Sequence, residues 1–215
     1  MATIDVEAIK RESEEIIRRY GGQTCDGLPC HDPADPARDV QAVARRALVL
    51  NAMLQIAFQA PIPVIKRWIS AHDLDDELVE SERAILEKEN ADLTEQERAN
   101  LHWYIEALWA LAWVGGLIEQ MPFDEHVGDN LAALCPNLQI GEDGAKFLTR
   151  MRLRPHDELY RMRDLYYRLH WWTRNAELQG QPTGNVSIDI IMERRKALEW
   201  TLNADDDWDN VNMST

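Results

Sequence analysis

Two segments of this chain interleave tryptophan with ionisable residues inside long helical patterns. They are residues 101–109 and 166–174, and each contains two tryptophans. Helical spacing places His, Glu or Arg where burial should be deep, and buried charge is costly unless it finds a partner. We therefore expect these segments to hold either a structural ion-pair network or a binding site.

The rest of the pattern is also helical. Period-two alternation is absent and β-branched residues are sparse, so no strand is predicted. No repeat or linker divides the chain, which predicts a compact, single-domain, all-α multi-helix bundle over residues 1–203 and an acidic tail at 204–215. We expect helices at about 3–20, 39–59, 64–72, 76–89, 95–120, 127–134, 144–151, 155–178 and 187–202.

Several residues predict how these helices begin and pack. Thr3 is expected to cap the first helix, and Thr94 with Glu97 forms a capping box before the helix at 95–120. The helix at 39–59 is apolar almost all round, which is typical of a central helix. Gly115-Gly116 is expected inside the helix at 95–120, where it would permit a kink or a close crossing.

Charge and composition limit the classes of function. The 215 residues carry a net charge of -15, which argues against nucleic-acid binding and against an anionic membrane surface. The same charge permits a basic protein partner, although an acidic composition also serves solubility alone. The N-terminus does not read as a signal peptide, and the most apolar stretch, 107–118, is too short to span a membrane. Three cysteines, an odd number, predict a reducing, cytoplasmic location.

Glu106 is the most constrained ionisable residue of the first segment. His102, Glu106, Trp109 and Trp113 share one flank of a helix whose other positions are mostly apolar. A buried carboxylate without a partner would protonate or destabilise the fold, so we expect an arginine partner or a raised pKa. A role as general base or metal ligand is the alternative.

The second segment offers cationic partners beside an apolar face. This adjoining face suits an anionic group, because arginine forks bind carboxylates and phosphates. The anion is either Glu106 itself or a ligand held between the helices at 95–120 and 156–178. The face consists of Arg163, Tyr166, Tyr167, His170, Arg174 and Glu177.

Metal ligation has weak support in the sequence. His102, Glu106 and His170 are one set of ligands on paper, and no HExxH motif or duplicated ExxH motif accompanies them. A second set joins the loop cysteines and a histidine to distant residues, namely Cys25, Cys30, His31, His126 and Cys135. Neither spacing matches an established zinc pattern, so we expect no metal and no cofactor.

A series of short motifs resembles the bacterial domain-of-unknown-function 4272 family over about residues 40–212. The resemblance implies a helical fold and supplies no assigned activity. It places Glu106, Arg168, His170, Arg174 and Trp208 within motif segments. The motifs are Arg45-Arg46-Ala47-Leu48, the span from Arg98 to Trp113 with Ile105-Glu106-Ala107-Leu108-Trp109, Leu153-Arg154-Pro155, Asp164-Leu165-Tyr166-Tyr167-Arg168-Leu169-His170-Trp171, Glu193-Arg194-Arg195, Ala197-Leu198-Glu199-Trp200 and Asp207-Trp208-Asp209-Asn210-Val211.

Two hypotheses for function follow. The first is a non-enzymatic interaction protein with a basic protein partner, and in it Trp208 docks on the body of the chain. The second is an enzyme or small-anion binder in which Glu106 is acid or base, His170 its proton partner, and Arg163 or Arg174 the anion clamp. The residues predicted to form the pocket or the buried ion-pair network are His102, Glu106, Arg163, Tyr167, Arg168, His170, Arg174 and Trp208.

Overall fold

The computed structural model describes residues 4–128 and 130–215, and this part of the chain is all-helical with no strand. The all-α prediction is confirmed. Short 3-10 turns occupy Asp75–Glu77, Asn90–Asp92, Leu138–Ile140 and Trp208–Asn210. The α-helices are α1 (Val6–Arg19), α2 (Val40–Ala57), α3 (Ile62–Ala71), α4 (Glu80–Leu86), α5 (Glu95–Val114), α6 (Leu131–Leu134), α7 (Ala145–Arg150), α8 (His156–Leu178) and α9 (Ile188–Thr201).

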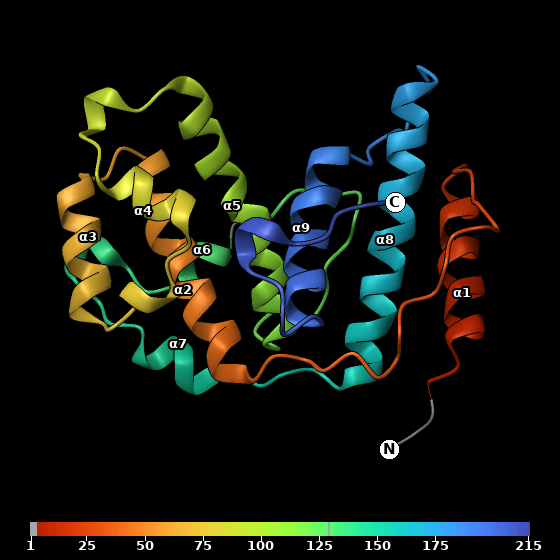
Figure 1. Ribbon diagram of the computed structural model, residues 1–215, viewed down its shortest axis with the longest axis horizontal. Helices are drawn as coiled ribbons and strands as arrows, with labels where there is room; N and C mark the ends of the chain where they lie inside the picture. Colours follow the sequence, from red (N-terminus) through yellow and green to blue (C-terminus); the bar gives the residue numbers. More distant parts are fainter. Residues whose placement is uncertain (1–3, 129) are drawn as a thin grey trace.

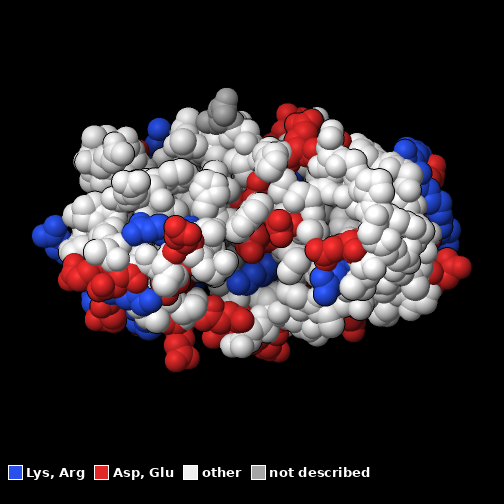
Figure 2. Space-filling view, turned by 90° about the horizontal axis from the view of Figure 1, so that it is seen from above, with Lys and Arg blue, Asp and Glu red and all other residues white. Residues whose placement is uncertain are grey.

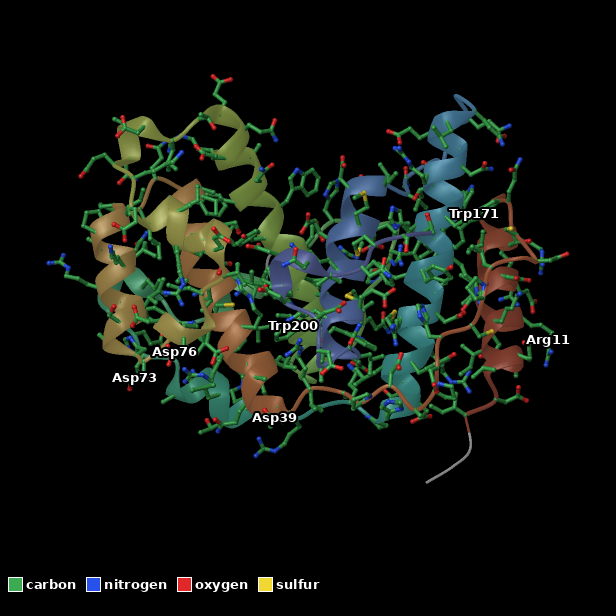
Figure 3. All side chains as sticks on the ribbon, in the orientation of Figure 1. Arg11, Asp39, Asp73, Asp76, Trp171 and Trp200 are labelled. Atoms are coloured by element: carbon green, nitrogen blue, oxygen red, sulfur yellow. The ribbon has the colours of Figure 1, made fainter. Side chains whose placement is uncertain are left out.

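Six of these helices lie side by side in one row, in the order α3, α2, α5, α9, α8, α1 (Figure 1). The last long helix of the chain, α9, therefore lies in the middle of the molecule, between α5 and α8. Trp200 of α9 marks this interior, whereas Arg11 of α1 and Asp73 lie at opposite ends of the row (Figure 3). No helix in the described ranges is long and apolar enough to cross a membrane.

The helix α2 is central, as its apolar surface predicts. It packs between α3 and α5, and its residues 46–54 are all buried. Asp39 begins the helix by accepting a hydrogen bond from Ala42 N at 2.8 Å. One continuous core joins α2 to the other helices of the row.

The capping box of α5 is confirmed, and the cap of α1 differs from the prediction. Thr94 and Glu97 cap each other's backbone N–H groups at the start of α5. The predicted cap Thr3 lies outside the described residues. Instead, the Asp5 carboxylate accepts a hydrogen bond from Ala8 N at 2.9 Å.

The prediction that α5 continues to about residue 120 is wrong. The helix ends at Val114, Gly115 is its C-terminal cap, and Gly116 has a left-handed φ of 68°. A β-carbon at Gly115 would lie 2.0 Å from the Met151 side chain, so the glycine permits a close approach. The close contact therefore forms at the C-terminal end of α5, where Gly115 meets Met151 of the segment before α8.

Two other predicted helices are shorter than expected. The range 76–89 is interrupted because Leu78 and Val79 are extended, and only Glu80–Leu86 is α-helical. Among the described residues of the range 127–134, only Leu131–Leu134 are α-helical. Before this helix, the Val127 N–H donates to the Glu106 carboxylate at 3.4 Å.

Candidate functional site

Glu106 of α5 forms a buried ion pair with Arg194 of α9. The Arg194 Nε atom donates to Glu106 Oε2 at 2.8 Å, and Nη2 lies 2.7 Å from the same oxygen. The Glu106 and Arg194 side chains are 2% and 0% exposed. The expected arginine partner is therefore present, but it belongs to α9 and not to the helix at 156–178.

Arg194 also fixes the loop that follows α5. Its Nη1 atom donates to the Pro122 carbonyl at 2.5 Å and to the Tyr166 hydroxyl at 3.2 Å. Its Nη2 atom donates to the Glu125 carbonyl at 2.8 Å. One guanidinium thus links α5, α8, α9 and the 122–127 loop, because its planar fork can satisfy several acceptors at once.

The position of α9 removes the pocket that the sequence suggests between α5 and α8. Both helices pack on α9, which fills the space between them (Figure 1). Glu106 faces Arg194 on one side of α9, whereas Arg163 and His170 face residues on the other side. Glu106 and His170 are consequently held by different arginines of α9, Arg194 and Arg195.

Glu199 of α9 is the centre of a second buried network. Its carboxylate accepts from Arg163 Nε at 2.6 Å and from Arg195 Nε at 3.0 Å. Arg163 also donates to Asp35 at 2.8 Å, and His31 Nε2 lies 3.6 Å from Glu199. Burial lowers the pKa of His31 even though Glu199 opposes this shift. Arg163 is therefore committed to carboxylates of its own chain.

His170 belongs to this second network. Its Nδ1 atom accepts a hydrogen bond from Arg195 Nη1 at 2.6 Å. Burial, followed by the positive charges of Arg195 and Arg174, lowers the pKa of His170 to about 4. The imidazole is neutral at neutral pH. Arg195 also lies over the Tyr167 ring, 4.8 Å from its centroid, and donates to the carbonyls of Met213 and Ser214.

Arg168 joins the N-terminal helix to α8. It donates to both oxygens of Asp164, at 2.9 and 2.8 Å, and lies 3.9 Å from Glu14 of α1. Its Nη2 atom also contacts the Pro29 carbonyl at 3.4 Å. The Arg168 and Asp164 side chains are 2% and 0% exposed, so this bidentate ion pair is a buried structural contact.

Two residues of the predicted site lie at the surface. His102 is exposed on α5, where its ring meets Phe58 edge-on with centroids 5.5 Å apart. Arg174 is half exposed and pairs with Glu177 at 2.6 Å. Neither residue is among the hydrogen-bond or ion-pair partners of Glu106 in the described part of the chain.

Trp208 docks on the body of the chain, as expected. Its side chain is buried between Arg46, 4.8 Å from the ring centroid, and Lys196, 5.0 Å away, and it meets Trp200 edge-on. Arg46 is itself paired with Glu82 of α4 in a buried bridge. Asp209 accepts from Ser81 N at 3.0 Å and from Ser81 Oγ at 2.7 Å.

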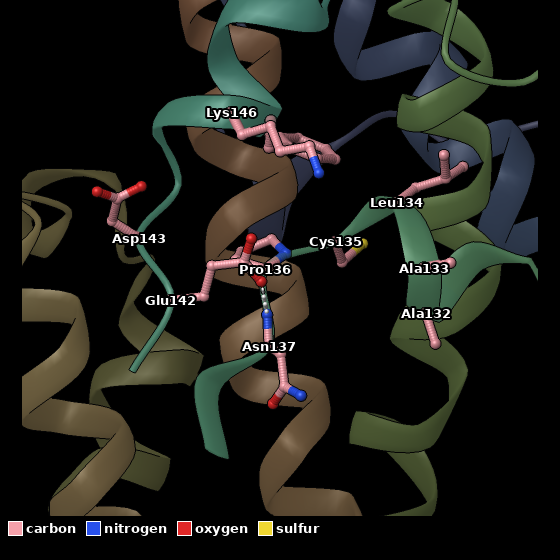
Figure 4. A pocket seen from close by; sticks show the side chains of 10 residues that line it. Ala132, Ala133, Leu134, Cys135, Pro136, Asn137, Glu142, Asp143 and Lys146 are labelled. Atoms are coloured by element: carbon pink, nitrogen blue, oxygen red, sulfur yellow. Dashed lines mark hydrogen bonds between the residues drawn. The ribbon is translucent and has the colours of Figure 1, made fainter. Parts of the chain in front are cut away.

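No group of three metal-ligating side chains comes together within residues 4–128 and 130–215. A hollow of about 260 Å³ lies between α6 and α7 (Figure 4), where Asn137 N donates to Glu142 Oε2 at 2.9 Å. Cys135 lines this hollow, and burial raises the pKa of its thiol to about 12. A thiol that stays protonated at neutral pH is a poor nucleophile and a poor metal ligand.

The buried charges cancel, so the surface carries the net charge of the chain. Within the described ranges, five arginines and five carboxylates are buried. The net charge of -15 is therefore displayed by exposed and half-buried residues, and Figure 2 shows carboxylates in several groups on one face. The buried residues are Arg46, Arg163, Arg168, Arg194 and Arg195, with Glu14, Glu82, Glu106, Asp164 and Glu199.

Acidic residues gather around α4. The exposed residues Asp75, Asp76 and Glu80 precede or begin α4. The acidic tail joins them because Asp209 is bonded to Ser81. Two segments distant in sequence thus contribute to one acidic surface, which consists of the exposed carboxylates within residues 73–80 and 205–209.

Sequence reasoning missed three residues that organise the interior. Arg194, Arg195 and Glu199 lie on α9, among the buried residues Ile190, Ile191, Ala197 and Leu198. That composition was a usable signal, because charged residues within an apolar helical pattern need internal partners. The fold and these ion pairs define an all-helical protein whose interior contains paired arginines and whose surface is acidic.

The chain belongs to the family described as Domain of unknown function (DUF4272), which it matches over residues 9–211. The match begins further toward the N-terminus than the stretch of about 40–212 that the resemblance covers, so it includes α1 and the cysteine loop. No curated protein and no solved structure matches the chain.

Proposed function

We propose that this chain is a non-enzymatic protein-interaction module whose partner has a basic surface. The observation that carries the proposal is the separation of charge between interior and surface. The buried arginines are occupied by internal carboxylates and carbonyls, and the excess of negative charge faces outward. Such a surface accelerates encounter with a positively charged partner and repels nucleic acid.

The test begins with native mass spectrometry of the untagged protein, purified gently from its own host at low salt. The expected spectrum contains a stoichiometric complex with a protein that carries a basic surface. The dissociation constant of that complex, measured with the two purified proteins, should rise steeply with ionic strength. An affinity that does not change with salt, a stoichiometric small molecule, or the absence of any partner would each contradict the proposal.

We also propose a cytoplasmic location. Its support is that Cys25, Cys30 and Cys135 are all free thiols. Free thiols persist in reducing compartments, where disulfides are rare.

A further inference from the structure

A preformed groove opens where α2 ends and α5 begins. Its volume is about 600 Å³, within the range of roughly 300–1,000 Å³ that is usual for ligand sites. The side of the molecule where α2 ends and α5 begins is the top in Figure 1, and it faces the viewer in Figure 2. The groove is lined by Ala57, Gln59, Pro61, Asn90, Ala91 and Arg98.

The walls of the groove are held by hydrogen bonds. The Asn90 side chain donates to the Ala60 carbonyl at 3.0 Å and accepts from Ile62 N at 2.9 Å, so it ties the 58–61 turn to the segment before α5. Arg98 donates to the Asn90 carbonyl at 2.5 Å. A groove that is already fixed before binding loses little entropy when it is occupied.

An exposed aromatic pair extends the groove along α5. Phe58 lies between two lining residues in sequence and is 56% exposed. Its ring meets the exposed ring of His102, which is one helical turn beyond Arg98. Exposed aromatic residues beside a groove are typical anchors of protein interfaces.

Three unpaired carboxylates lie next to lining residues in sequence: Glu89 and Asp92 flank Asn90 and Ala91, and Glu95 lies one helical turn before Arg98. Glu89, Asp92 and Glu95 are exposed and form no ion pair within the described part of the chain. Their acidic neighbours differ, because Glu87 pairs with Lys66 and Glu97 pairs with Lys88. Arg98 is the one charged residue that lines the groove, and its guanidinium donates to the Asn90 carbonyl.

We infer that this groove binds a short basic segment of a partner protein, in which one aromatic or long aliphatic side chain is flanked by Lys or Arg. The apolar side chain packs against Phe58 and Pro61, and the flanking cations face Glu89, Asp92 and Glu95. The inference rests on the proposed function, because it gives the basic partner a place to dock. We call this surface the Phe58 groove.

The test uses a fluorescently labelled synthetic peptide with a central tryptophan between lysines and arginines. Two control peptides replace the tryptophan by serine or the cations by glutamate. Fluorescence anisotropy should show binding of the first peptide only. Peptide-induced amide shifts in NMR spectra should centre on residues 57–61 and 90–102.

Variants separate the groove from general acidity. Phe58→Ala should weaken peptide binding about tenfold, whereas Ile140→Ala, which removes a more exposed apolar side chain elsewhere, should leave it unchanged. The triple variant Glu89→Gln, Asp92→Asn, Glu95→Gln should weaken binding about tenfold more than Asp26→Asn, Glu125→Gln, Asp157→Asn, which changes the net charge equally. Thermal melting of every variant confirms that each is folded.

The outcomes distinguish this inference from the proposed function. Equal weakening by both triple variants, or amide shifts centred on the acidic surface at 73–80 and 205–209, would overturn the Phe58 groove and leave a basic partner in place. Absence of binding by the basic peptide, together with a native salt-sensitive partner, would also overturn the groove alone. Absence of both would end the two proposals together.

Discussion

The Glu106 carboxylate on α5 and the Arg194 guanidinium on α9 form an ion pair at the centre of the helix row, closed off from solvent. Removal of one partner leaves the other charged and buried. Glu106→Gln should therefore destabilise the protein by about 3–5 kcal/mol, measured by urea unfolding. Glu177→Gln, which breaks the exposed pair with Arg174, should change stability by less than about 1 kcal/mol.

The double variant Glu106→Gln, Arg194→Met checks the reason for this loss. With both charges gone, no charge is left unpaired, so the double variant should be more stable than Glu106→Gln alone. If the two substitutions instead add in full, the pair is not the source of the destabilisation.

Trp208→Ala should destabilise the protein by about 3–5 kcal/mol, because it empties a buried site and exposes the Arg46–Glu82 bridge. Asp209→Ala should lose about 1 kcal/mol, since it removes an acceptor from the first turn of α4. Urea unfolding measures both losses, and hydrogen exchange should show faster exchange of α4 amides in each variant. Protection of α4 that is unchanged in Trp208→Ala would refute the docking role.

Glu193→Gln should stabilise the protein at neutral pH and above. Glu193 is half-buried on α9, and burial raises its pKa from 4.5 to about 7. The folded state holds this proton more tightly, so the contribution of Glu193 falls as pH rises from 4.5 to 7. Glutamine removes that loss, by on the order of 1–3 kcal/mol above pH 7. Urea midpoints of parent and variant should converge below pH 4.5.

His170→Asn tests a pH dependence of stability whose sign is opposite to that of Glu193. The pKa of His170 is lowered from 6.5 to about 4, so the unfolded chain takes up a proton in this interval that the folded chain does not. The contribution of His170 is fully present above pH 6.5 and is lost as pH falls toward 4. Asparagine retains an acceptor for Arg195 and does not titrate. The variant should therefore lose up to about 3 kcal/mol of pH dependence in urea unfolding. An unchanged slope would show that folding does not lower the pKa of His170.

Much of the fold could be predicted because it depends on local pattern. The Thr94–Glu97 capping box and the apolar circumference of α2 specify their helices without help from distant residues. The end of α5 at Gly115 was missed, because two adjacent glycines are compatible with a kink or with a terminus. Packing of Met151 against Gly115 accompanies the second outcome, and no local pattern reveals that contact.

The site was predictable only in part. Burial alone requires a cation for Glu106, and the sequence indicates that need. The identity of the cation depends on which helix lies next to α5, and that neighbour is α9, which follows some 90 residues later. The same placement separates Glu106 from His170, although both helical wheels present them toward an inner face.

The central position of α9 has a consequence for synthesis of the chain. A ribosome releases α5 and α8 before α9, so Glu106 and Arg163 emerge ahead of Arg194 and Glu199. Ion pairing in the middle of the row must then wait for the last helix to insert between two earlier ones. We expect the nascent chain to remain a loose intermediate, open to chaperones and proteases, until residues near 200 have left the exit tunnel.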